Sequence, residues 1–96
     1  MGSVFYAQGD HAAALEAYGR ALAIYEQVLG PQSERVGETC NNMARAYEAR
    51  GEREQARAFY GRAAAAYAAA LGPEDESAVR ARESAAQLSS LLFRTR

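Results

Sequence analysis

The 96-residue sequence is short of cysteine, proline and long apolar runs, and each shortage narrows the class of protein. A single cysteine cannot form an internal disulfide, which excludes a disulfide-stapled domain and favours a reducing, cytoplasmic location. No apolar run approaches the roughly 20 residues of a membrane span, and we expect no signal peptide. Prolines and glycines stand only at a few points, so we expect one small domain without a linker.

The sequence also lacks an excess of one charge, with a formal net charge of −1. We therefore expect no nucleic-acid partner and no membrane-surface partner. His11 is the only histidine and Cys40 the only cysteine, so we expect no metal and no cofactor. No nucleophile–base pair or phosphate loop is present, so we predict a protein that is not an enzyme. Gly19 and Gly61 are expected inside helices, where close approach to a neighbouring backbone would explain them.

Two amphipathic helices are predicted on either side of Gly51, because apolar residues recur there at helical spacing. Before the glycine the predicted buried face holds Cys40, Met43, Ala44 and Tyr47. After it the face holds Ala56, Tyr60, Ala63 and Tyr67. A glycine at the break can end the first helix at low cost.

The same pattern occurs twice in the chain, at an offset of 42 residues. Tyr18-Gly19-Arg20-Ala21 returns as Tyr60-Gly61-Arg62-Ala63, and Leu29-Gly30-Pro31 returns as Leu71-Gly72-Pro73. A repeat of this length built from helix pairs is typical of a solenoid.

The ends of the other helices carry capping residues and Gly-Pro stops. Asp10 and Ser33 are predicted to cap helices that follow them, and Gly30-Pro31 and Gly72-Pro73 to end helices at Leu29 and Leu71. Asp75 or Ser77 is predicted to start the last helix. For the helix that follows Asp10 we expect one apolar face, made of Leu15, Tyr18, Leu22, Tyr25 and Leu29, with Ala14, Ala21 and Val28 beside it.

The run from Cys40 to Ala63 resembles the tetratricopeptide repeat, whose signature has W-x2-L-G-x2-Y and then A-x3-F. Cys40 stands at the tryptophan position, and Tyr47 and Ala56-x3-Tyr60 match the later ones. The longer period and the Leu-Gly-Pro stop are similar to the kinesin-light-chain type. The resemblance implies an all-α fold, an α-solenoid of antiparallel helix pairs with about five helices, counting a partial first helix and a terminal one.

The repeat also predicts how the chain divides. Residues 1–3 resemble an expression-vector remnant, and residues 4–96 are expected to form one domain cut from a longer array. Within it, residues 4–31 would be a partial repeat, 32–73 a full repeat, and 74–96 either a capping helix or a truncated repeat. The last helix is expected to bury Ala81, Ala85, Leu88 and Leu92.

A polar helix face opposite the buried one carries the candidate binding residues. In the resembling family the first helix of each pair lines a concave groove, and asparagine there bonds the backbone of a bound peptide. The predicted groove comprises Glu38, Asn41, Asn42, Arg45, Glu48, Arg80, Glu83 and Gln87, with Ser84 beside them.

Two functions are compatible with this pattern. The first is a scaffold that binds a partner protein or peptide on its concave face. The second is a structural segment of a larger adaptor, which would self-associate through exposed ends near Leu15 or Leu22 and at residues 91–93. A plain solvated face remains the alternative for the candidate groove.

Overall fold

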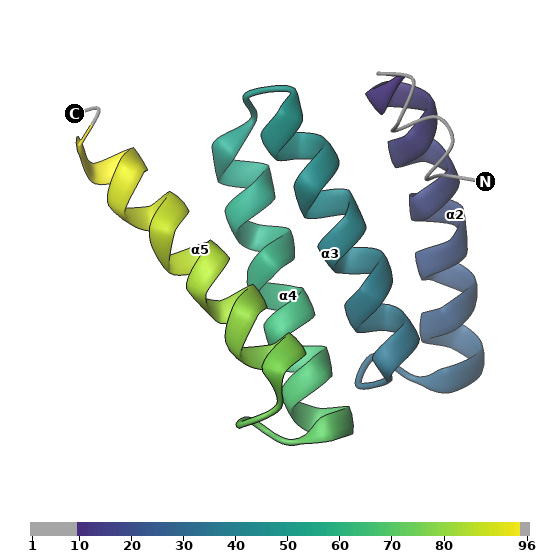
Figure 1. The fold of residues 1–96 in the computed structure, drawn as a ribbon. Helices are drawn as coiled ribbons and strands as arrows, with labels where there is room; N and C mark the ends of the chain where they lie inside the picture. Colours follow the sequence, from purple (N-terminus) through teal and green to yellow (C-terminus); the bar gives the residue numbers. More distant parts are fainter. Residues whose placement is uncertain (1–9, 95–96) are drawn as a thin grey trace.

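The computed structural model describes residues 10–94, which fold into helices and contain no strand. The helices are α2 (His11–Leu29), α3 (Glu34–Ala49), α4 (Arg53–Leu71) and α5 (Glu76–Arg94). They stand side by side in chain order and alternate in direction (Figure 1). This confirms an all-α fold consistent with a helical solenoid; the predicted partial first helix lies outside the described residues.

The helix starts follow the predicted caps. The Asp10 carboxylate accepts a hydrogen bond from the backbone N–H of Ala13 at 3.1 Å, and Ser33 Oγ accepts from Val36 N–H at 3.2 Å. Asp75 Oδ2 accepts from Ser77 N–H at 2.9 Å, which makes Asp75 the cap of α5. Each cap satisfies a backbone donor that has no partner within its own helix.

The turn at Gly51 reverses the chain between α3 and α4. Glu52 N–H donates to the carbonyl of Tyr47 at 2.9 Å, and Gly51 N–H donates to that of Glu48 at 3.0 Å. With a φ of 80° at Gly51, this is a Schellman motif, which satisfies the last carbonyls of α3. The short turn holds the two helices of the pair against each other.

The core follows the two predicted helix faces. Cys40, Met43 and Ala44 of α3 are buried and Tyr47 is partly buried; Ala56, Tyr60, Ala63 and Tyr67 of α4 are all buried. On α5, Ala81 and Leu88 are buried, Ala85 is half-buried, and Leu92 is a side chain that the structure does not describe. Small side chains let the helix backbones approach, and the rings fill the remaining space.

The predicted apolar face of α2 is wrong in part. Ala14 and Leu22 are buried, and Leu15 is half-buried, but Val28 is 73% exposed and Leu29 52%. Leu71, the equivalent of Leu29, is 41% exposed, so this position points outward in both repeats. The large apolar side chains exposed on α2 are Ile24, Val28 and Leu29.

The expected close approach to a neighbouring backbone is wrong for both Gly19 and Gly61, and the close contact lies at Gly37 instead. Apart from its own helix backbone, a Cβ added to Gly19 or to Gly61 would meet no described atom within 4 Å. A Cβ added to Gly37 would come within 2.9–3.1 Å of three ring carbons of Tyr67. Gly37 is the position at which a ring from α4 lies directly on the backbone of α3.

Candidate functional site

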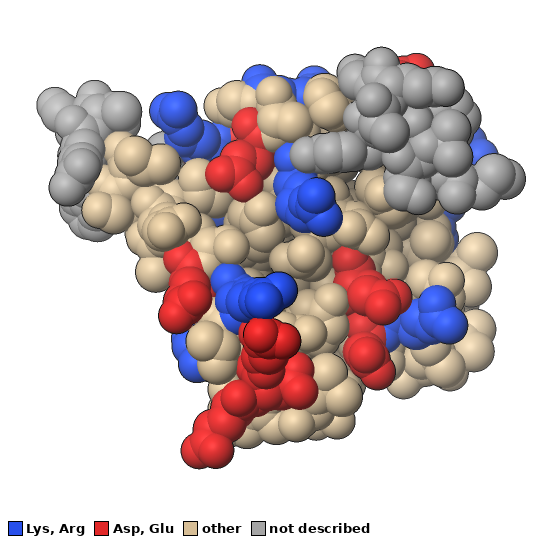
Figure 2. Space-filling model, in the orientation of Figure 1, with Lys and Arg blue, Asp and Glu red and all other residues tan. Residues whose placement is uncertain are grey.

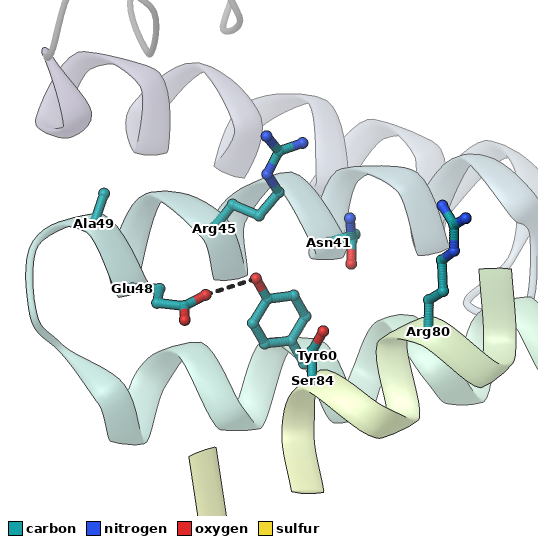
Figure 3. Close-up of a pocket in the computed structure, with 7 residues that line it drawn as sticks. All are labelled: Asn41, Arg45, Glu48, Ala49, Tyr60, Arg80 and Ser84. Atoms are coloured by element: carbon teal, nitrogen blue, oxygen red, sulfur yellow. Dashed lines mark hydrogen bonds between the residues drawn. The ribbon is translucent and has the colours of Figure 1, made fainter. Parts of the chain in front are cut away.

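A pocket of about 390 Å³ lies where α3, α4 and α5 meet. It is lined by Asn41, Arg45, Glu48, Ala49, Tyr60, Arg80 and Ser84. Figure 3 shows the α3 side chains on one side, Arg80 and Ser84 of α5 on the other, and the ring of Tyr60 between them. Because α3 and α5 are the first helices of two successive pairs, this pocket is where the predicted groove should lie.

Tyr60 fixes the centre of the pocket. Its ring is 5% exposed, and its hydroxyl donates a 2.8 Å hydrogen bond to Glu48 Oε1 (Figure 3). The bond holds an exposed carboxylate of α3 at the hydroxyl end of a buried ring of α4. One wall of the pocket is thus fixed by packing and a charge-assisted hydrogen bond.

Two arginines from different helices reach the same pocket. Arg45 of α3 and Arg80 of α5 are both exposed, and Asn41 is half-buried beside them. Arg80 pairs with Glu76, one turn earlier on α5, at 3.1 Å. The side chains of Arg80 and Glu76 are 74% and 77% exposed, so their ion pair contributes no more than about 1 kcal/mol to stability. Another anion can therefore take the place of Glu76 beside Arg80.

The other predicted site residues fall elsewhere. Glu38 and Asn42 line a second pocket of about 340 Å³ between α2 and α3, together with Ala17, Tyr18, Ala21, Tyr25 and Thr39. Glu83 and Gln87 are exposed and line neither pocket. α5 diverges from α4 toward its carboxyl end (Figure 1).

Three of the seven residues that line each pocket correspond under the 42-residue offset. Tyr18, Glu38 and Asn42 of the second pocket correspond to Tyr60, Arg80 and Ser84 of the first. At one of these positions the charge changes sign, from Glu38 to Arg80. The sequence repeat contained this part of the information, because the offset maps these three lining residues onto one another.

The molecular surface carries both signs of charge. Basic and acidic side chains are interspersed on the face shown in Figure 2, with acidic ones gathered at its lower edge. Glu26 of α2 and Arg62 of α4 form a 2.7 Å ion pair that joins the two repeats. Arg62 also lies 5.3 Å from the ring centre of Phe59, which stacks on Tyr47.

The described residues give little sign of a reactive side chain or a metal site. Burial raises the pKa of the Cys40 thiol, which keeps it protonated and unreactive near neutral pH. Burial, reinforced by Glu38, raises the pKa of Tyr67 to about 12. Between residues 10 and 94 no group of three or more His, Cys, Asp or Glu side chains could hold a metal ion. No described helix combines the length and apolar character needed to cross a membrane.

Comparison with known families agrees with the repeat pattern. The tetratricopeptide repeat model matches residues 1–69, and the chain belongs to this family. No curated protein matches it. Tetratricopeptide repeats generally mediate protein–protein interaction and are typically scaffolds without catalysis of their own.

Proposed function

We propose that this chain is a protein-interaction module that binds an extended segment of a partner protein in the pocket between α3 and α5. The observation that carries the proposal is that Arg45 and Arg80, from first helices of successive pairs, meet in one pocket with Asn41. Asparagine offers a donor and an acceptor to a peptide backbone, and arginine binds carboxylates through two parallel hydrogen bonds.

The charges of the pocket favour a mixed or mildly acidic partner segment. Glu48 is held by Tyr60, so it can receive a basic or amide group of the partner, while the two arginines receive acidic ones. Glu38, Asn42, Glu83 and Gln87 would contact the partner only where it extends beyond this pocket. Further parts of the proposal are a kinesin-light-chain-like subtype, a single domain over residues 4–96, a cytoplasmic location, and no catalytic, nucleic-acid or membrane role.

The test uses peptides selected from a random display library on the intact protein. Asn41→Ala with Arg45→Ala should weaken their binding at least about tenfold, since hydrogen bonds to charged groups contribute about 1.5–3 kcal/mol. The melting temperature should hardly change, because Arg45 is exposed and Asn41 is only half-buried. Gln55→Ala with Arg57→Ala is the matched control, since both are exposed on α4 and outside the pocket.

The outcomes are distinct. If both double variants weaken peptide binding equally, or if Asn41→Ala with Arg45→Ala does not weaken it, the pocket is not the binding site. The alternative function, a structural segment that packs on copies of itself, predicts a mass that rises with concentration in light scattering. Leu91, 41% exposed near the end of α5, is a residue through which such contacts would form.

A further inference from the structure

The charged groups of the pocket between α3, α4 and α5 follow a fixed order along it. Figure 3 shows Glu48 toward the turn between α3 and α4, Arg80 of α5 at the opposite end, and Asn41 between them. Glu48 and Asn41 are seven residues apart on α3, which separates them by about 10 Å along the helix axis. Since Arg80 lies beyond Asn41, the positions of Glu48 and Arg80 are more than about 10 Å apart along the pocket.

Glu48 is the negative end of the pocket, and its position is fixed. The Tyr60 hydroxyl donates a 2.8 Å hydrogen bond to Glu48 Oε1, and the Tyr60 ring is buried in the core. A carboxylate accepts several hydrogen bonds, so the bond to Tyr60 leaves acceptor capacity for the ammonium or guanidinium group of a ligand. The pocket therefore offers a basic group a carboxylate that is already held in place.

Arg80 is the positive end. Its ion pair is with Glu76, which does not line the pocket and lies one turn earlier on α5. A guanidinium has five N–H donors, so Arg80 can bind the carboxylate of a ligand as well. Arg45 lies between the two ends, and Figure 3 shows its guanidinium directed away from the Glu48 carboxylate, so the end at Glu48 stays negative.

We infer that the pocket selects a partner segment that carries a basic and an acidic residue four positions apart in an extended chain. An extended chain rises about 3.3 Å per residue, and successive side chains point to opposite sides. Residues two apart share a side but span only about 7 Å, whereas residues four apart share a side and span about 13 Å. The backbone between them would pass Asn41, whose amide has a donor and an acceptor for it. The inference rests on the proposed function and adds the charge pattern and its spacing.

The probes are short labelled peptides with one lysine and one glutamate, placed two, three, four or six positions apart. Threonine and serine fill the other positions, because β-branched and hydroxyl side chains disfavour a helix. Each peptide is made in both orders of charge, since either chain direction can satisfy the two ends of the pocket, and the tighter order is used. Fluorescence anisotropy with the intact protein should show the spacing of four to bind at least about fivefold tighter than the others.

Two variants test the two ends separately. Glu48→Gln keeps an oxygen for the Tyr60 hydroxyl but removes the charge, so it should weaken binding of the best peptide about tenfold. It should change binding of the same peptide without its lysine by less than about twofold. Arg80→Gln should act in the same way on the glutamate. The matched controls, Glu54→Gln and Arg82→Gln, remove the same charges from exposed positions outside the pocket and should leave the affinity within about twofold.

The melting temperatures of Glu48→Gln and Arg80→Gln should match that of the wild type, because both side chains are exposed. Three results would overturn the inference: equal affinity at every spacing, equal losses in the controls, or no binding of any of these peptides at about 1 mM. Failure of the proposed function is a different result. Library peptides that depend on Asn41 and Arg45, but not on Glu48 or Arg80, would keep the pocket as the binding site and remove the charge pattern.

Discussion

At the scale of single residues, two glycines on adjacent helices have opposite packing environments. Gly37 of α3 lies under the ring of Tyr67, and a Cβ there would come within 2.9 Å of a ring carbon. Gly61 of α4 is exposed, and a Cβ there would meet nothing within 4 Å among the described residues. The same substitution should therefore change stability in opposite directions at the two positions.

Gly37→Ala should destabilise the protein by about 1–3 kcal/mol, because the Tyr67 ring and the helix backbone must separate. Gly61→Ala should stabilise it by about 0.5–1 kcal/mol, because alanine loses less backbone entropy in a helix. Urea denaturation of both variants measures the two changes. A stabilised Gly37→Ala variant would show that Tyr67 moves aside without cost.

The residue scale also shows where the sequence stops being predictive. Helical spacing identified Cys40, Met43, Ala56 and Tyr60 as core residues because burial follows the helix face. It did not identify Gly37, because a contact between helices depends on their separation, which a one-helix pattern does not contain. For the same reason Gly61 was misread as a contact glycine.

At the scale of elements, the second helix of each pair, α2 or α4, ends at a position whose backbone conformation only glycine adopts without strain. Gly30 has φ 88° and ψ 160°, and Gly72 has φ 100° and ψ 149°. This region is essentially restricted to glycine, because a Cβ would clash with the local backbone. The chain leaves each helix sharply at this point and turns to begin the next repeat.

Gly72→Ala should therefore cost about 1–3 kcal/mol through backbone strain alone. Beyond Gly72 itself and its two chain neighbours, a Cβ at this position would meet no described atom within 4 Å, so collision with other parts of the fold contributes nothing. Thermal unfolding checks the value, with Gly61→Ala as the control for adding a methyl group within the same helix. A variant as stable as the wild type would indicate that the turn relaxes to another conformation.

Helix limits were the most predictable feature of the elements, and the candidate groove the least. Asp10, Ser33 and the Gly-Pro stops act locally, so their sequence signals were sufficient. The groove depends on the angle between helices. This angle brings Arg45 and Arg80 to one pocket and leaves Gln87 outside it. The division of Glu38 and Asn42 into a second pocket also depends on packing between α2 and α3.

At the scale of the whole molecule, the helices form a row in which each packs mainly on its neighbours in sequence (Figure 1). Stability in such a row is close to a sum over helices and neighbouring interfaces. α3 has seven buried residues and α4 five, whereas α2 has only Ala14 and Leu22. The centre of the row should therefore be its most stable part.

Native-state hydrogen exchange should show this gradient directly. Amides in the middle of α3 and α4 should exchange only through global unfolding, and those of α2 through a partial opening that is lower by at least about 1 kcal/mol. Tyr60→Ala should lower protection in α3 and α4 by about 3–5 kcal/mol, because Tyr60 is 5% exposed between them. If the free energy of global unfolding of the Tyr60→Ala variant falls below the free energy of the partial opening, α2 should unfold together with the other described helices. Equal protection of α2 and α4 in the wild type would mean that the half-covered face of α2 is as well stabilised as the covered face of α4.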